Sequence, residues 1–547
     1  MGSGLIRSLV VVGLVAFGGA GWSVPAHAQG LEAASMAALP APRLIFSQEE
    51  MELAQAVAAS PGLADFYGSN GLKPIFLGAE GAPRRAALIE AISAASSHGL
   101  PPARYHRGRL QQLDGQGDQS LQAELAFARN FVRWTQDLTG GFLDPHKVDS
   151  GIKRSVARSG TGKLMREFMQ APDPQAWLAG LAPRDRDYLA LQDALSGMSR
   201  LAAPAGTPAV PKGSWREGDG GAGVAKLRER LAAIGFDSIP TADPETFDAP
   251  LVQAVAEFQD AAGLPADGVA GPQTVARLNR GVGPEAKGIL VALERMRWMH
   301  GHDMNDRLVW VNLPAYTAEI RENGETVFST KVVIGKDEAT HETPEFTEDM
   351  KYIVANPRWN VPRSITVKEY LPRLQANRNA VGHIDVVDRA GNVISRDRID
   401  FRKYTASNFP YRMRQKPSDD NALGVVKFLF PNPWNIYLHD TPTKHLFNES
   451  RRAYSHGCIR VGRPLDLAHE LMQGQFKNPE ATFSKALSSG REAYLNLTKP
   501  LPVHLVYFTA FPDEDGRIRR YPDIYGRDAA VYAALVKAGL ESAGRGN

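Results

Sequence analysis

The spacing of the apolar residues changes near residue 300, and this change limits the folds that are open to the chain. Before it, apolar residues recur at helical spacing, as Leu88 and Ile92 do. After it, short apolar runs are separated by Gly and Pro, and Val503, Leu505 and Tyr507 alternate as in a strand. We therefore predict a multi-domain α+β protein that is helical first and mainly β afterwards.

The length of the chain predicts several domains. Its 547 residues correspond to three or four domains of ordinary size. The formal net charge is only +3, so the slight basic excess argues against nucleic acid as the main partner. The predicted segments are a signal peptide (1–28), a helical region (29–200), a linker (201–216), a compact helical module (217–282), a mainly β domain (283–511) with an insertion (364–421), and a C-terminal tail (512–547).

The first residues have the pattern of a secretory signal. Arg7 supplies the positive charge, an apolar stretch follows from Leu9 to Ala20, and Ala26-His27-Ala28 has the small residues of a cleavage site. The apolar stretch is short for a spanning helix, which needs about 20 residues. We expect export from the cytoplasm, and a membrane contact only if the signal stays uncleaved.

The stretch 437–460 holds the only cysteine of the chain, Cys458, with His456 two residues before it and His439 further upstream. A single cysteine in an exported chain has no internal disulfide partner, so its thiol is free for chemistry. A fold that places His439 beside Cys458 would supply a base within hydrogen-bond reach, and nearby cationic groups lower a thiol pKa. Gly457 removes a side chain beside the thiol, which lets a substrate carbonyl and backbone N–H groups approach.

Two other interpretations of Cys458 stay open at this point. It could be a buried apolar cysteine, because free cysteine is often buried, although the Ser-His-Gly flank suits a turn. It could also bind a metal ion together with His439, His445 and His456, although no C-x-x-C or H-x-x-x-H pair accompanies it. A catalytic Cys–His pair fits the pattern best, and its chemistry needs no metal or cofactor.

His439, followed after a gap by Ser455-His456-Gly457-Cys458, resembles the signature of the L,D-transpeptidases, the cysteine enzymes of peptidoglycan cross-linking. The upstream residues Arg414-Gln415-Lys416-Pro417 and Asn421-Ala422-Leu423-Gly424 are similar to those of the large, multi-domain, periplasmic branch of that family. One departure is Arg460, where smaller relatives often carry Asn. The resemblance implies a periplasmic enzyme.

The other segments resemble parts of the same branch. Residues 29–200 are similar to its scaffold domain, and residues 217–282, with Phe258-Gln259 and Asp267-Gly268, resemble a three-helix peptidoglycan-binding module, with a generic helical bundle as the alternative. The insertion 364–421 resembles a subdomain that caps the active-site cleft. A cap would keep water from an acyl-enzyme, although an ordinary surface insertion stays open.

The resemblance also implies a mechanism and a set of roles. Cys458 would attack the carbonyl of the third stem residue, a diamino acid, D-Ala would leave, and an amine would then attack the thioester. His439 is the expected base for the thiol and later for the amine, oriented by the Asp440 backbone. Backbone N–H groups around Gly457 and Cys458 are the expected oxyanion donors, and Tyr437 and His456 are expected to help. The expected substrate-binding or oxyanion residues are Tyr437, Asp440, Ser455, Arg460, Arg414 and Lys416.

The acceptor of the acyl group stays open. A stem amine would give a 3→3 cross-link, a protein amine would anchor an envelope protein to the wall, and water would trim the stem. The expected partners are therefore peptidoglycan, through a stem tetrapeptide donor and an amine acceptor, or an envelope protein as the acceptor. A non-catalytic peptidoglycan-binding scaffold protein is the alternative from a different class.

Overall fold

The computed structural model of the protein describes residues 46–201, 203, 207–236, 243–280 and 285–540. The predicted signal peptide, residues 1–28, lies outside these ranges. Every helix within them is too short or too polar to span a membrane.

Short helices around an apolar core form the first part of the chain. The helices are α1 (Gln48–Val57), α2 (Pro61–Ser69), α3 (Gly78–Ser93), η1 (Ala95–His98), η2 (Pro102–Tyr105), α4 (Arg107–Gly115), α5 (Leu121–Gly140), α6 (Pro145–Val148), α7 (Thr161–Gln170), α8 (Pro174–Ala179) and α9 (Arg186–Arg200). Aromatic rings fill the core, where Phe131 and Phe168 stack with their centroids 4.6 Å apart. The prediction of a helical region is confirmed.

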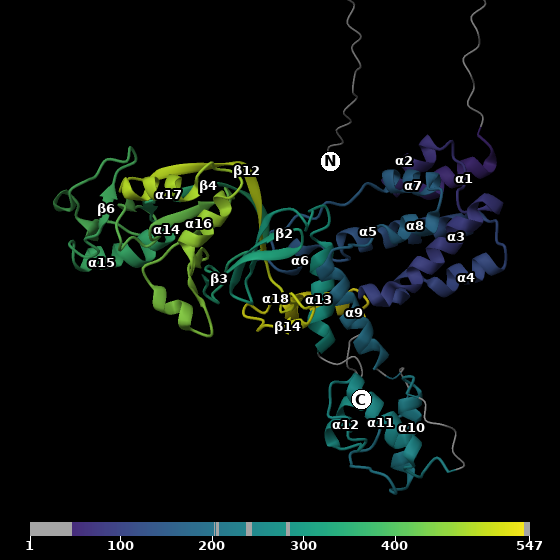
Figure 1. The fold of residues 1–547 in the computed structure, drawn as a ribbon. Coiled ribbons are helices and arrows are strands. Elements are labelled where there is room, and N and C mark those ends of the chain that lie inside the picture. The colour runs from purple at the N-terminus through teal and green to yellow at the C-terminus, as the bar shows by residue number, and fades with distance from the viewer. Residues whose placement is uncertain (1–45, 202, 204–206, 237–242, 281–284, 541–547) are drawn as a thin grey trace, which may run out of the picture. The chain divides into compact units, whose positions relative to one another are not determined.

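Three further helices, α10 (Ala222–Ala232), α11 (Ala249–Ala261) and α12 (Pro272–Asn279), form a bundle (Figure 1). Part of the predicted linker belongs to this bundle, because Val210 is buried in its core. The backbone of Val210 pairs with the Asn279 side chain at 2.9 and 2.6 Å. The Arg230 guanidinium binds the carbonyls of Thr207 and Pro208. The structure therefore corrects the linker prediction for residues 207–215.

The mainly β domain is built on one sheet, which has nine strands in the described part of the chain. In spatial order they are β10 (Ala453–Ser455), β3 (Glu325–Gly335), β11 (Ile459–Val461), β9 (Leu438–His439), β8 (Val426–Leu429), β4 (Phe346–Ala355), β12 (Ala493–Val506), β1 (Leu308–Asn312) and β2 (Thr317–Glu322). β12 lies beside β4 (Figure 1), and β1 pairs with its other edge. Because β2 also pairs with β3, the sheet closes on itself. Asn323 and Gly324 form the hairpin turn between β2 and β3, both with positive φ, as the Asn-Gly pair favours.

Other helices accompany this sheet. They are α13 (Glu285–Arg297), η6 (Lys444–Asn448), α16 (Pro464–Met472) and α17 (Pro479–Ser488). α16 and α17 bury Leu467, Leu471 and Phe483 in the apolar core that the strands share. This packing covers the apolar side chains that the strands project from the sheet.

The insertion has an apolar core of its own. Its elements are β5 (Trp359–Asn360), α14 (Arg363–Ile365), η3 (Thr366–Tyr370), α15 (Leu371–Ala376), β6 (Ile384–Val387), η4 (Arg396–Arg398), η5 (Phe401–Lys403) and β7 (Arg412–Gln415). Consecutive helical turns, η3 and α15, run through residues 366–376 of this insertion. Sequence analysis missed the small sheet with strand order β5-β7-β6. Its strands are short, and β5 and β7 are far apart in the sequence, so no local alternation marks them.

The last segment is folded rather than an extended tail. β13 (Ala510–Pro512) and β14 (Ile518–Arg520) form a hairpin, and α18 (Arg527–Lys537) follows. α18 buries Val531 and Leu535 in the same core as the N-terminal helices. Its Arg527 is fully buried and donates to the Thr343 carbonyl at 3.0 Å. Sequence analysis missed this helix.

A buried ion pair in α13 leads to a stability prediction. Glu294 is fully buried and accepts hydrogen bonds from Arg297 at 2.7 Å, the Trp298 indole at 3.0 Å and the Leu143 N–H at 2.8 Å. Glu294→Ala would leave the buried Arg297 without its carboxylate. We expect it to destabilise the protein by about 3–5 kcal/mol, measured by urea unfolding followed through tryptophan fluorescence.

The control for Glu294→Ala is an exposed ion pair. Glu167 lies 3.7 Å from Lys163 on the surface of α7, with both side chains well exposed. Glu167→Ala should change stability by less than about 0.5 kcal/mol. Equal effects of the two substitutions would contradict a special role for the buried pair.

Candidate active site

Two neighbouring strands bring the predicted catalytic residues together. β9 and β11 run parallel, with Leu438 opposite Ile459 and His439 opposite Arg460. Cys458 comes directly before β11. Because side chains alternate along a strand, Tyr437 and His439 project from the same face as Cys458 and Arg460.

These side chains line a pocket of about 340 Å³. One wall comes from β9, β11 and the loops beside them, and the other comes from the insertion. The lining residues are Trp359, Pro362, Ile365, Glu369, Tyr370, His383, Gln415, Asp420, Ala422, Leu423, Tyr437, His439, Thr441, Pro442, Thr443, Ser455, His456, Cys458 and Arg460. The insertion therefore forms one wall of the pocket that contains the thiol.

The Cys458 side chain is half-buried, and its thiol donates to the Asn435 carbonyl over 3.6 Å. Burial raises the pKa of the Cys458 thiol to about 11, while Tyr437, Arg460 and Lys427 act in the opposite direction. The expectation of a lowered thiol pKa is thus wrong for this structure. At neutral pH the thiol keeps its proton, so an attack on a carbonyl needs a base. The interpretation of Cys458 as a buried core residue is also wrong, because it lines a pocket.

His439 is held as a neutral imidazole. It is buried, and its Nδ1 donates to the Asp440 backbone carbonyl, as the sequence predicts. Burial lowers the pKa of His439 to about 3, and the positive charge of Arg460 adds to this effect. With the proton on Nδ1, Nε2 is left as an acceptor, which is the form that a general base requires.

The turn before Cys458 has a defined hydrogen-bond pattern. The Ser455 hydroxyl donates to the Cys458 carbonyl at 2.5 Å and accepts from the Gly457 N–H at 3.1 Å. Gly457 has φ of 108°, a conformation that side chains disfavour, and the Thr343 hydroxyl donates to its carbonyl at 2.8 Å. The Gly457 N–H is therefore engaged within the turn. The Cys458 N–H has no acceptor in the described part of the chain and stays available as an oxyanion donor.

The remaining predicted residues differ in their placement. Arg460 lines the pocket, and its Nη1 donates to the Thr443 hydroxyl at 3.0 Å. The Asp440 carboxylate faces away toward Val425, whose N–H it accepts at 2.9 Å. Arg414 and Lys416 do not line the pocket, and Lys416 instead lies 3.4 Å from the Asp385 carboxylate within the insertion. The expected contact of these two residues with a substrate carboxylate is therefore not what the structure shows.

Several pocket residues were not predicted from the sequence, and they lie in or near the insertion and in the segment 441–443 after β9. Gln415, between Arg414 and Lys416, faces the pocket because alternate residues of β7 point in opposite directions. Its side chain binds the backbone of Asp420 and Ala422 at 3.0 Å each. Trp359, Glu369, Tyr370 and His383 also line the pocket. Only strand alternation around Gln415 could have indicated one of them in advance.

Within the described ranges, no three His, Cys, Asp or Glu side chains gather closely enough to hold a metal ion. His439 donates to a backbone carbonyl, and His456 donates from Nε2 to Glu369 at 2.7 Å. The alternative of a metal site around Cys458 therefore gains no support from the geometry.

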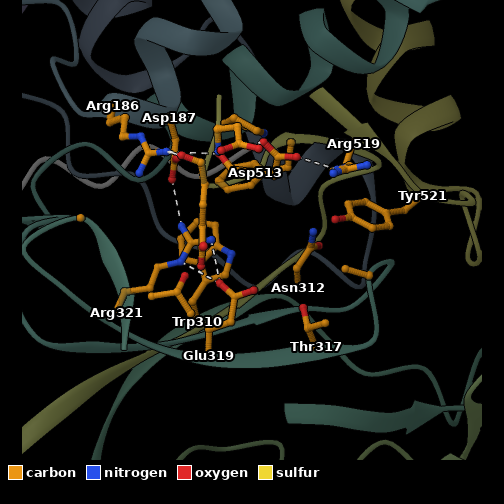
Figure 2. Close-up of a pocket in the computed structure, with 17 residues that line it drawn as sticks. Arg186, Asp187, Trp310, Asn312, Thr317, Glu319, Arg321, Asp513, Arg519 and Tyr521 are labelled. Carbon is orange, nitrogen blue, oxygen red and sulfur yellow. Dashed lines mark hydrogen bonds and ion pairs between the residues drawn. The ribbon is translucent and has the colours of Figure 1, made fainter. Parts of the chain in front are cut away.

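A second pocket, of about 350 Å³, lies between β1, β2 and the β13–β14 hairpin. Figure 2 shows ion pairs among several of its side chains. Arg321 binds Asp187 at 2.9 Å, and Arg519 binds Asp513 at 2.7 Å. The lining of this pocket contains no cysteine, so the pocket around Cys458 is the candidate active site.

The structure thus combines several domains with a closed sheet, and one pocket on that sheet contains Cys458, His439 and His456. Comparison with known families identifies the domains. Residues 306–478 match the L,D-transpeptidase catalytic domain, residues 61–195 match the scaffold domain, and residues 220–278 match a provisionally named peptidoglycan-binding domain. The chain carries an L,D-transpeptidase catalytic domain together with these two domains.

A relative with the same catalytic assignment occurs in Haemophilus influenzae. This protein, named provisionally as an L,D-transpeptidase, is 34% identical over 230 residues, which are 42% of this chain and 46% of the relative. The matched part thus spans about half the length of that curated relative.

Two solved L,D-transpeptidase structures were also compared. Those from Xylanimonas cellulosilytica and Stackebrandtia nassauensis are 18% and 16% identical, with TM-scores of 0.15 and 0.16. Each match covers 55% of this chain, and 99% and 97% of the respective solved chain. With TM-scores this low, the assignment depends on the family match and not on these superpositions.

The raised thiol pKa predicts the pH dependence of alkylation. Because the thiolate is the reactive form, iodoacetamide should modify Cys458 slowly at pH 7, and the rate should rise about tenfold per pH unit up to pH 10. The rate should level off only near the pKa of about 11. Intact mass measured over time gives the rate. A plateau already at neutral pH would show that the thiolate is stabilised in the free enzyme.

Proposed function

We propose that the protein is a cysteine L,D-transpeptidase that acts on peptidoglycan stem peptides. The observation that carries this proposal is Cys458, which lines a covered pocket with His439 and His456 inside a domain matched to the L,D-transpeptidases. The peptidoglycan-binding and scaffold matches support the wall as the substrate. The predicted signal peptide supports a periplasmic location.

The proposed first step is acylation. Nε2 of His439 takes the proton of the Cys458 thiol as the sulfur attacks the carbonyl of the third stem residue, a diamino acid. The Cys458 N–H and the Tyr437 hydroxyl stabilise the negative charge that develops on the carbonyl oxygen. The bond to D-Ala breaks, D-Ala leaves with a proton on its nitrogen, and a thioester on Cys458 remains.

The pocket explains how a thiol with a raised pKa can still act as the nucleophile. A neutral thiol beside a neutral imidazole avoids two buried charges in the resting enzyme, and charge appears only when a carbonyl is present. Arg460, whose side chain lines the pocket, is the proposed partner for a stem carboxylate, since guanidinium groups bind carboxylates in a fork. No corresponding role is proposed for Arg414 and Lys416.

The proposed second step is attack on the thioester by an amine of another stem, which gives a 3→3 cross-link. The insertion favours this outcome over hydrolysis, because it covers the thiol and limits the access of water. Anchoring of an envelope protein through its own amine is a second candidate acceptor reaction. It uses the same acyl-enzyme and differs only in the acceptor.

Two experiments test the proposal. Intact mass after incubation with a carbapenem, a β-lactam that acylates enzymes with this chemistry, should show a covalent adduct on Cys458. A chain that forms no adduct would be a non-catalytic wall-binding protein. Analysis of wall fragments from cells with the wild type and with Cys458→Ala should then show a loss of 3→3 dimers. If the dimers persist and a wall-linked protein disappears, the acceptor is a protein.

A further inference from the structure

A carboxylate of the insertion reaches the motif that contains the nucleophile. Glu369 lies in η3, a π-helical turn, and accepts a hydrogen bond from Nε2 of His456 at 2.7 Å. Both residues line the same pocket as Cys458. Such exposed pairs contribute little to global stability, and π-helical turns occur often at functional sites. We therefore expect the contact to act on the His456 imidazole and not on the stability of the whole domain.

The two imidazoles of the pocket have opposite electrostatic surroundings. Burial and the charges of Arg460 and Lys427 lower the pKa of His439, and the neighbouring Asp440 offsets only part of this effect. His456 is half-exposed and is bonded to a carboxylate. Of the two imidazoles, His456 is therefore the one with a carboxylate hydrogen-bonded to its ring.

The other titratable groups that face His456 do not reverse this difference. The His341 ring lies edge-on to the His456 ring, with centroids 4.5 Å apart. His341 is itself 2.9 Å from the Glu338 carboxylate, so its surroundings are also acidic. Cys458 is the remaining titratable neighbour, two residues along the chain.

We propose that Glu369 is a positioning residue that orients His456 and stabilises its protonated form during transfer of the acyl group to the amine. The inference rests on the proposed function and assigns a role within its second step. Because Nε2 of His456 donates to Glu369, the lone pair of Nδ1 is left to accept a proton. Sequence analysis expected His439 to serve both steps, and this inference divides them between two imidazoles.

The proton and electron balance of the step is as follows. The neutral amine nitrogen forms a bond to the thioester carbon, and the C–S bond breaks with its electron pair going to sulfur. The proton that the nitrogen loses goes to Nδ1 of His456, and the Glu369 carboxylate stabilises the positive charge that results. The imidazolium then returns this proton to the Cys458 thiolate, which restores the neutral thiol of the resting enzyme.

The contact between Glu369 and His456 connects the insertion to the transfer step. Glu369 comes from the insertion, whereas His456 and Cys458 come from the sheet. The base for the transfer step is therefore complete only while the insertion lies over the pocket, which is also when water is limited. An amine acceptor is thereby favoured at the moment when hydrolysis is least able to compete.

The test compares Glu369→Gln with Asp397→Asn. Gln keeps the size of the side chain and can accept the hydrogen bond, but lacks the charge. Asp397 is an exposed carboxylate of the same insertion, paired with Arg378 at 3.1 Å and outside the pocket, so its neutralisation is a matched control. Two rates are measured on the full chain between pH 6 and 9. They are acylation of Cys458 by a carbapenem, followed by mass, and transfer from a tetrapeptide donor to a stem amine.

We expect Glu369→Gln to acylate within about threefold of the wild-type rate and to transfer about 10–100-fold more slowly at pH 7, in the lower range of acid–base effects. The difference in transfer rate between Glu369→Gln and the wild type should shrink as the pH rises, because hydroxide then removes the amine proton. Glu369→Asp should recover part of the rate, and Asp397→Asn should match the wild type. Transfer at the wild-type rate would overturn the inference, and so would an equal loss in both steps, which indicates a purely structural contact. If the wild type itself is not acylated, the proposed function fails instead.

Discussion

Cys458→Ala should reduce transpeptidation by about 10⁴-fold or more, because removal of a covalent nucleophile eliminates the acyl-enzyme route. The substituted protein should give no mass adduct with a carbapenem and no transfer of a tetrapeptide donor to a stem amine. It should still fold, because Ala fills the same position with a smaller side chain. The two measurements are intact mass and chromatography of the cross-linked product.

Chemical modification of the thiol provides the matched control. The chain has no other cysteine, so a long incubation with iodoacetamide at about pH 8–9, where lysine amines are still mostly protonated, should modify Cys458 first, and peptide mass identifies the modified residue. The alkylated wild type should lose activity as completely as Cys458→Ala, while its thermal unfolding stays close to that of the untreated protein. Residual cross-linking in either preparation would show that another group carries the acyl chain.

His439→Gln should slow acylation by about 10²–10⁴-fold, the usual range for loss of a general base. The reason is the raised thiol pKa of about 11, since very little thiolate exists at neutral pH without a base. Gln has a side chain of similar length and can donate to the Asp440 carbonyl, but it cannot take the thiol proton. The acylation rate, measured by mass at pH 7, checks the prediction.

The pH profile separates this effect from a loss of structure. Raising the pH toward the thiol pKa should restore part of the acylation rate of His439→Gln, because hydroxide then ionises the sulfur. His146→Gln, on the exposed surface of α6, should leave the rate unchanged and serves as the control substitution. A rate for His439→Gln that is close to wild type at pH 7 would assign the base to another residue.

Much of the fold follows from local spacing. The periodic apolar residues predict α3, α5 and α9, and the Asn323-Gly324 pair predicts the hairpin between β2 and β3. These predictions succeed because each depends on a few consecutive residues. The strands of the insertion escape prediction because β5 and β7 pair over a long sequence separation and are too short to show alternation. The C-terminal helix α18 was not predicted, because the Arg- and Asp-rich stretch before it indicated a polar tail.

The features of the candidate site were likewise predictable from the sequence only in part. The motif identifies Cys458 and His439, and it also predicts the contact of His439 with the Asp440 carbonyl, which the structure contains. The thiol pKa was predicted in the wrong direction, because nearby cations are visible in the sequence but burial is not. Glu369 carried no signal at all, since no pattern within the insertion relates it to His456.

The sequence by itself therefore indicated the candidate nucleophile, the change from helices to strands and the family that the motif resembles. These are properties of neighbouring residues, and periodicity and spacing record them directly. The tertiary structure alone decided that burial holds the Cys458 thiol protonated, that Arg414 and Lys416 lie outside the pocket, and that Glu369 meets His456. Desolvation and charge–charge distance depend on which distant segments meet, and that is settled only when the chain has folded.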